Sequence, residues 1–410
     1  MFDWSTRIAA LPDGRCYGDH AAQKIWAAVF LGSACQFGSL HRIETECRQG
    51  ALRHRIGPLS EDTIGYVLQR QDPDQIFTLG CNIARQLKRN QVFASTWSRG
   101  LLVAAVDGIE ICNSFARCCP QCLERTVKRK VGGKEREQIN YYHRISVVSL
   151  VSGAFPIPLG IRFQRQGEEE VACSLALLED LLQRLGRRFL DVLVADALYL
   201  RTSFAEKIEA LGLDWVITLK GNQPELLAEA ERASHAQAPH APCAQQEEAL
   251  QLWYLPQLDW AIANRAVQVI KTVHQPRRKH QQVEHLESGE KRIIKVAEAE
   301  PSTNFYASNL ELRSIPPFFI HQLGRSRWHI DTCLFHMLSR EGALKQPSLH
   351  QGQPTALVVL TMIRVLSFAL AQVFYHRQVR SHFRRLPPGF CDLARRMAEQ
   401  FLPISLPDSS

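Results

Sequence analysis

The stretch LLVAAVDGIEI at Leu101–Ile111 decides the fold. It opens with a continuous run of Leu, Val and Ala without polar alternation, which predicts a strand covered on both faces. The run ends in Asp107, and Gly108 follows at once. An ionised carboxylate at the end of a buried strand is costly unless a basic partner, backbone donors or a metal ion compensates its charge. The rest of the chain must therefore contain the compensating group.

A second apolar strand ends in the same way. DVLVADALYL at Asp191–Leu200 carries Asp196 after a run of Val, Leu and Ala. Two acidic residues at strand ends of one sheet suit a pair of Mg²⁺ ions, which prefer oxygen ligands. Two such ions activate an attacking oxygen and stabilise the leaving one in phosphoryl transfer. The alternative is that each Asp only caps a loop. Because Asp107 and Asp196 both follow an apolar run of the same kind, we favour metal binding for the two residues.

A third carboxylate is expected on a helix further along the chain. The segment GRSRWHIDTCLFHML at Gly324–Leu338 has helical spacing of apolar residues. One helical face carries Ile330, Leu334 and Leu338. Asp331 lies in this segment and follows the basic residues Arg325 and Arg327. We therefore take Asp331 as the candidate third ligand.

The pattern of apolar residues divides the chain into four segments. Residues 1–95 have three-to-four spacing and predict a helical region, with Ser60 as the N-cap of one helix. Residues 96–220 read as three strands, a helix, a strand, a helix and a strand, which is an α/β order. Residues 221–304 predict a β-rich insertion that forms a separate sub-domain, and residues 305–400 predict the rest of the core with C-terminal helices.

Composition points to a soluble protein that meets a polyanion. The net charge is +8, and hydrophobic residues make up 45% of the 410 residues, an ordinary share for a globular chain. The start, MFDWSTR, lacks the pattern of a signal peptide. Most of the twelve cysteines stand alone in apolar contexts, so reduced thiols in a cytosol are expected. The apolar stretch 356–374 is long enough to span a membrane, but Arg364 at its middle favours a buried helix.

A cysteine cluster follows the first strand. RCCPQCLER contains Cys119 and Cys122, with Cys118 adjacent, Cys112 upstream and His143 downstream. Paired cysteines at this spacing with a further Cys or His are typical of structural Zn²⁺ sites. We take Cys119, Cys122, His143 and Cys112 as the candidate zinc ligands. The alternative is a reduced turn of small apolar residues.

Basic residues gather at several places. Residues 124–136, ERTVKRKVGGKER, predict a basic hairpin tip next to the cysteine cluster. Other clusters lie at residues 277–279, 325–327 and 377–385. Such clusters can neutralise phosphates without reading sequence, although solvated helix faces look the same. The candidate DNA-binding residues are Lys128, Lys130, Arg277, Arg278, Lys279, Arg325, Arg327 and Trp328.

Five short motifs in this order resemble one known family. They are VDG at 106–108, YYH at 141–143, ADALYL at 195–200, LKGNQ at 219–223 and RSRWHID at 325–331. The chain resembles a bacterial insertion-sequence transposase of the DDE superfamily, of the IS-four group. The resemblance implies an α/β fold with a ribonuclease-H-like mixed-sheet core, interrupted by the β-rich insertion.

The resemblance also implies the site. Asp107, Asp196 and Asp331 would hold Mg²⁺ or Mn²⁺, with Asp107 bound through the metal to a DNA phosphate. The family usually has Glu at the third position, one methylene longer, or about 1.5 Å of reach. Gly324 stands where Tyr is usual, and residues 338–339 stand where Lys is usual. These departures predict impaired catalysis.

The function expected is metal-dependent cleavage at the ends of an insertion element, then strand transfer to target DNA. The implied partners are the terminal inverted repeats, target DNA and a second copy of the chain on DNA, with no membrane. The implied location is the bacterial cytoplasm, with the nucleoid when bound to DNA. The alternatives are a nuclease on the same fold, a decayed DNA-binding remnant, and a zinc-centred interaction module.

Overall fold

The computed structural model describes most of the chain. Described are residues 4–11, 14–15, 18, 20–95, 97–131, 134–240, 250–274, 279–285, 291–298, 301–311, 315–345, 354–380 and 389–401. They form two compact units, the first made of residues 1–189 and 328–410, and the second of residues 190–327. The division into four segments predicted from the sequence stays a prediction.

The N-terminal part of the first unit is helical, as predicted. Its helices are α1 (Trp4–Ala9), α2 (Ala22–Ala34), α3 (Leu40–Gln49), α4 (Glu61–Arg70) and α5 (Pro73–Arg89). Ser60 caps α4 by accepting a hydrogen bond from the Thr63 N–H, which confirms the predicted cap. Ser39 caps α3 in the same way.

The C-terminal helix α11 (Pro354–Phe374) forms the centre of this helical region, where it contacts α2, α4 and α5. It continues into η4 (Tyr375–Val379), and α12 (Phe390–Glu399) follows. The run is long and apolar enough to cross a membrane, but 78% of its most apolar window is buried inside the protein. The Arg364 guanidinium donates to the carbonyls of Ala343 at 3.0 Å and Gly38 at 2.8 Å. The predicted buried helix is therefore confirmed.

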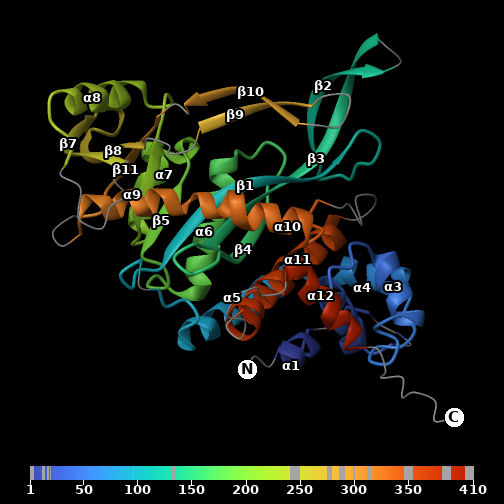
Figure 1. The fold of residues 1–410 in the computed structure, drawn as a ribbon. Helices are drawn as coiled ribbons and strands as arrows, with labels where there is room; N and C mark the ends of the chain where they lie inside the picture. Colours follow the sequence, from blue (N-terminus) through green and yellow to red (C-terminus); the bar gives the residue numbers. More distant parts are fainter. Residues whose placement is uncertain are drawn as a thin grey trace. The chain divides into compact units, whose positions relative to one another are not determined.

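The first unit contains the antiparallel part of the core. Its strands are β1 (Val103–Ser114), β2 (Leu123–Val131), β3 (Lys134–Leu150) and β4 (Ile157–Phe163). The inner part of β3 pairs with β1 and with β4, and its outer part pairs with β2 alone. The β2–β3 hairpin is the predicted basic ribbon, and it projects from the rest of the unit (Figure 1). Helix α6 (Glu170–Leu185) packs on β3, β4 and β1.

The second unit contains the parallel strands. Buried β5 (Val192–Ala195) pairs in parallel with β6 (Asp214–Leu219), and α7 (Thr202–Ala210) connects them. Helix α9 (Pro317–Ser326) packs on β6, β5 and neighbouring strands. Apart from the ribbon strand β2, the chain order is the antiparallel strands β1, β3 and β4, the helix α6, and the parallel strands β5 and β6 joined by α7. This order confirms the predicted ribonuclease-H-like α/β core.

The inserted region is β-rich, as predicted, and one of its two strand pairs joins the core sheet of the second unit. After α8 (Pro224–His235), β7 (Leu250–Trp260) and β8 (Arg265–His274) form a hairpin around η2 (Ala261–Ala263). The strand β11 (Ser302–Ser308) pairs with β8 on one side and β6 on the other, so the hairpin extends the core sheet of this unit. A separate pair is formed by β9 (Lys279–His285) and β10 (Lys291–Glu298).

Candidate functional site

Asp107 lies within β1, at the point where the strand becomes partly exposed, and not at the strand end that the sequence predicts, because β1 continues to Ser114. The preceding residues, Val103 to Val106, are fully buried, and Asp107 is half-buried. Its Oδ1 accepts a hydrogen bond from the Gly108 N–H at 2.8 Å. A Cβ on Gly108 would lie 2.7 Å from Glu170 Oε1, so Gly108 faces α6. Because successive strand residues point to opposite faces, Asp107 points away from α6.

Asp331 lies in the same unit, on a helical segment that contacts β1. The segment is η3 (Ile330–Phe335), a π-helical turn that continues into α10 (His336–Arg340). Ile330 and Leu334 are fully buried and anchor the turn, while Asp331 is half-buried. Wide π turns inside helices are frequent at functional sites. The helical position predicted for Asp331 is therefore present, in a form that apolar spacing did not indicate.

Asp196 follows β5 in the second unit and has a basic partner. Its Oδ1 lies 3.1 Å from Lys220 Nζ, at the end of β6. Burial works against ionisation of Asp196, but the Ala197 N–H, Lys220 and the charge of Arg327 outweigh it and hold its pKa below the ordinary value. The carboxylate is therefore negatively charged at neutral pH.

The LKGNQ motif positions the loop that follows Asp196. Asn222 Nδ2 donates to the Ala197 carbonyl at 2.6 Å, and Gln223 Nε2 donates to the Leu200 carbonyl at 2.8 Å. Gln223 Oε1 in turn accepts a hydrogen bond from Trp260 Nε1 at 3.0 Å, at the end of β7. The ADALYL and LKGNQ motifs, which are separate in sequence, are thus hydrogen-bonded to each other beside Asp196. Trp260 of the β7–β8 hairpin supports this arrangement.

The basic residues near the third carboxylate differ in exposure. Arg325 and Trp328 are exposed, and Trp328 keeps 52% of its surface accessible. Arg327 is buried and contributes its charge to Asp196. Arg327 is thus placed to act on the electrostatics of Asp196, whereas the side chains of Arg325 and Trp328 lie at the surface.

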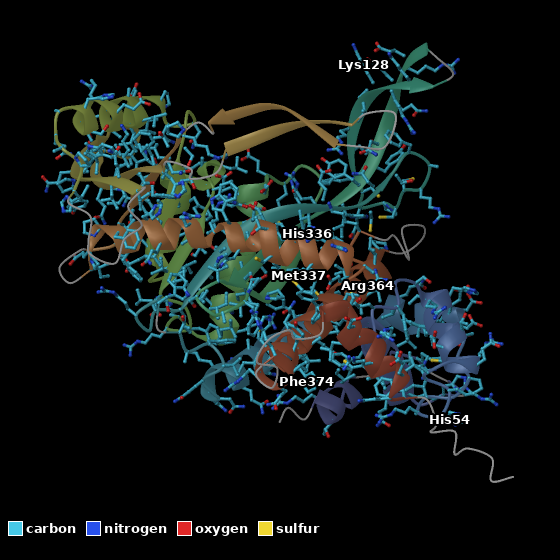
Figure 2. All side chains as sticks on the ribbon, viewed as in Figure 1. His54, Lys128, His336, Met337, Arg364 and Phe374 are labelled. Carbon is cyan, nitrogen blue, oxygen red and sulfur yellow. The ribbon has the colours of Figure 1, made fainter. Side chains whose placement is uncertain are left out.

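The β2–β3 ribbon carries exposed lysines toward its tip and an ion-paired arginine nearer its base. Lys128 and Lys130 are exposed, and Lys128 lies toward the tip of the ribbon (Figure 2). Arg125, nearer the base, donates to Glu110 Oε1 at 2.8 Å and Oε2 at 3.0 Å. Among the other predicted DNA-binding residues, Arg277 and Arg278 lie outside the described residues, as does the side chain of Lys279.

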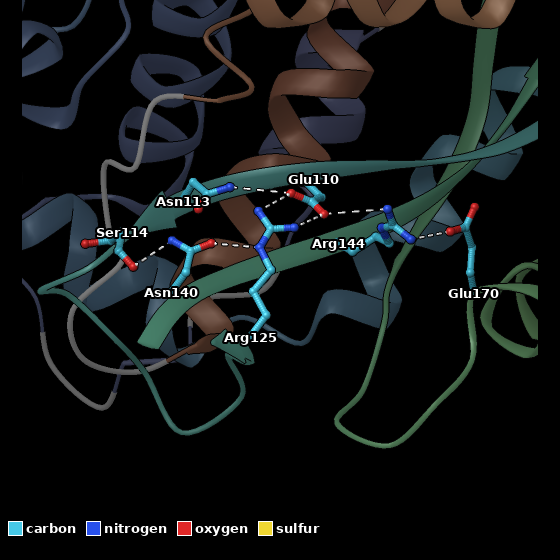
Figure 3. Close-up of polar contacts among 7 residues, drawn as sticks. All are labelled: Glu110, Asn113, Ser114, Arg125, Asn140, Arg144 and Glu170. Atoms are coloured by element: carbon cyan, nitrogen blue, oxygen red, sulfur yellow. Dashed lines mark hydrogen bonds and ion pairs between the residues drawn. The ribbon is translucent and has the colours of Figure 1, made fainter. Parts of the chain in front are cut away.

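A polar network on the α6 face of the sheet was not predicted from the sequence. Glu110 binds both Arg125 and Arg144, and Arg144 also pairs with Glu170 of α6 (Figure 3). Asn140 accepts from Arg125 Nε at 3.1 Å and donates to the Ser114 carbonyl at 3.2 Å. The network joins β1, β2, β3 and α6, so it holds the base of the ribbon. Only the alternation of charged residues on neighbouring strands could have indicated it.

The predicted cysteine cluster is assembled in part. The Sγ atoms of Cys119 and Cys122 and a ring nitrogen of His143 lie within 4.8 Å of one another. Cys112, the fourth predicted ligand, is buried near them at a bulge of β1 but is not a member of this group. Its role stays a prediction.

Comparison with known proteins gives a family match and several similar solved structures. The family model described as the transposase DDE domain matches residues 114–330, more than half of the chain. A cryo-EM structure of a piggyBac transposase synaptic complex with hairpin DNA is similar at a TM-score of 0.42 and 11% sequence identity. That match covers 97% of this chain and 76% of the other chain. No curated protein matches.

Proposed function

The chain belongs to the transposase DDE domain family, and we propose that it cuts DNA at the ends of an insertion element and joins those ends to target DNA. The observation that carries this proposal is the environment of Asp196. An ionised carboxylate follows a buried strand, Lys220 balances its charge, and Asn222 and Gln223 brace its loop. A residue that only capped a loop would not need this second motif. We also propose that the chain belongs to the IS-four group.

Asp107, Asp196 and Asp331 would hold the divalent ions that DDE transposases use, and we propose Mg²⁺ or Mn²⁺. The donor set fits, because carboxylate oxygens are the ligands that Mg²⁺ prefers. At Asp196 the Lys220 ammonium already pairs with Oδ1, so a bound metal ion would use the other carboxylate oxygen or displace this ion pair. When bound, two ions supply activation of the attacking oxygen and stabilisation of the leaving oxygen. Asp196 contributes a charged acceptor, because its pKa is held low.

DNA would be held by residues outside the carboxylate set. Lys128 and Lys130 on the ribbon and exposed Arg325 would neutralise phosphates, and Trp328 would stack on a base. The predicted run Arg277, Arg278 and Lys279 would add to the same electrostatic contact. We propose two copies of the chain on paired element ends, acting in a bacterial cytoplasm without a membrane.

A cleavage assay tests the proposal. The substrate is DNA that flanks the gene and includes its inverted repeats, with Mg²⁺ or Mn²⁺ as the metal. Wild-type protein should nick the ends and transfer them to a plasmid, whereas Asp196→Asn should lose both reactions and keep DNA binding. Exposed Asp392 on α12 provides the control, and Asp392→Asn should cleave like the wild type.

The other outcomes identify the alternatives. Cleavage without strand transfer would indicate a nuclease on the same fold. DNA binding with no cleavage by the wild type would indicate a decayed remnant, in which Asp331 in place of Glu is one cause to test. Cleavage that survives Asp196→Asn would overturn the assignment of the site.

A further inference from the structure

Three side chains of metal-binding types converge at the base of the ribbon. Cys119 and Cys122 lie in the turn between β1 and β2, and His143 comes from β3. Cys122 and His143 are 1% and 2% exposed, and Cys119 is partly exposed. No part of the proposed cleavage chemistry uses these residues.

Their spacing matches the edges of a tetrahedron. The two Sγ atoms are 3.6 Å apart, and His143 Nε2 lies 3.3 Å from Cys119 Sγ and 3.5 Å from Cys122 Sγ. With Zn–S bonds of about 2.3 Å and Zn–N bonds of about 2.0–2.1 Å, ligand atoms around tetrahedral Zn²⁺ lie about 3.5–3.8 Å apart. One ion can therefore reach all three atoms with small adjustments.

The surrounding backbone supports thiolates in this arrangement. The Cys119 N–H points to Cys122 Sγ at 3.2 Å, and the Cys122 N–H closes the turn on the Cys119 carbonyl. Gln166, in the turn after β4, donates its side-chain amide to the Cys122 carbonyl at 2.7 Å. Such contacts fix the direction of metal ligands. Both cysteines are free thiols, so a disulfide does not explain their approach.

We propose that Cys119, Cys122 and His143 form the core of a structural Zn²⁺ site. The ion takes two thiolates and a neutral imidazole, and the two thiol protons are released on binding. The fourth position falls to Cys112, Cys118 or water. The selection of a soft metal over Mg²⁺ follows from the two sulfur ligands.

The site would connect the two strands of the ribbon at their base. Cys122 directly precedes Leu123, the first residue of β2, and Leu123 pairs with Tyr142, the residue before His143. The ion would therefore link β2 to β3 at the end where the ribbon leaves the sheet. The role of Lys128 and Lys130 in DNA binding rests on the proposed function. The metal site is independent of that function.

Metal analysis of the purified full-length protein tests the site. We expect one zinc per chain by mass spectrometry of the metal, and release of zinc when Cys119→Ser, Cys122→Ser or His143→Ala is made. Co²⁺ in place of zinc should give the intense visible bands of a tetrahedral ion with thiolate ligands. Buried Cys81 provides the matched control, since Cys81→Ser should keep its zinc. Cys112→Ser and Cys118→Ser should also keep zinc, because the core ligands Cys119, Cys122 and His143 all remain and water can fill the fourth position.

Hydrogen exchange then tests the structural role. Removing zinc with a chelator should speed exchange of the amides near Leu123 and Tyr142 and leave those of α5 unchanged. Zinc absent from the wild type, and no tetrahedral Co²⁺ spectrum on reconstitution, would overturn the proposal, as would zinc retained when Cys119 and Cys122 are both replaced. DNA affinity is a separate readout: zinc bound with DNA affinity unchanged on its removal would overturn the DNA role of the ribbon only.

Discussion

Lys220 Nζ and Asp196 Oδ1 lie 3.1 Å apart and connect the two motifs that follow β5 and β6. The ion pair is partly exposed, so its contribution to folding is small. Its effect on the charge of Asp196 is the larger consequence, because the ammonium favours the carboxylate over the acid. The pair thus keeps a candidate metal ligand ionised.

Replacing this lysine should raise the pKa of Asp196. In Lys220→Gln the carboxylate loses a hydrogen bond and a positive charge, while the opposing effect of burial stays. Carbon-detected NMR titration of the metal-free protein should show Asp196 protonating at a higher pH than in the wild type. Exposed Lys207 on α7 is the control, and Lys207→Gln should leave the titration unchanged. An unchanged titration in Lys220→Gln would mean that the Ala197 N–H and Arg327 suffice.

Removing the side chain of Gln223 should destabilise the loop after Asp196. Gln223→Ala leaves the Leu200 carbonyl with only the 3.5 Å contact from Asn222. It also leaves the buried Trp260 N–H without its acceptor, at a cost of about 1–3 kcal/mol. Urea unfolding should show this loss, and metal-dependent cleavage should fall with it. Exposed Gln237, replaced in the same way, should change neither. Full stability in Gln223→Ala would show that the loop is held by other contacts.

A Cβ at position 324 should clash with Tyr306. It would lie 2.3 Å from Tyr306 Cδ1, and that ring is only 2% exposed. Gly324→Ala should therefore cost about 1–3 kcal/mol in the free energy of unfolding, as other overpacked sites do. Adding Tyr306→Leu should recover part of this loss, so the two effects should not be additive. Additive losses would indicate that the helix backbone, and not the ring, is responsible.

Gly324 also shows what the sequence could and could not predict. Apolar runs predicted the buried parts of β1 and β5, because such runs depend on local pattern, but they did not show that β1 continues beyond Asp107 to Ser114. The close approach of Gly324 to Tyr306, where α9 packs on β11, depends on tertiary structure and cannot be predicted from the sequence alone. The hydrogen bond from Asn222 to the Ala197 carbonyl depends on tertiary structure. So does the pairing of β8 with β11, which makes the β7–β8 hairpin part of the sheet.

Acid should weaken the second unit through His321. Burial, with the charges of Arg325 and His274, lowers the pKa of His321 from 6.5 to about 4. Between these values the unfolded chain binds a proton that the folded chain does not, so stability falls as pH falls through this window. The full effect is on the order of 3 kcal/mol. His321→Phe should flatten this part of the urea-denaturation profile, and an unchanged slope would place the acid sensitivity elsewhere.

Asp331 gives the sharpest test of the third ligand. It lies on η3, which contacts β1, the strand that carries Asp107. If Asp331 is a ligand, Asp331→Asn should abolish cleavage of element ends with Mn²⁺ while the protein still folds and binds DNA.

Asp331→Glu distinguishes a site that is weakened by the shorter Asp side chain from a site that has adapted to Asp. The added methylene moves the carboxylate by about 1.5 Å, and a misplacement of about 1 Å can cost a hundredfold in rate. In a protein weakened only by the shorter side chain, cleavage should rise. In a protein whose π-helical turn has adapted to Asp, cleavage should fall. Thr332, the exposed neighbour on the same turn, provides the control, since Thr332→Ser should keep the wild-type rate. Equal cleavage by the wild type and Asp331→Asn would exclude Asp331 from the site.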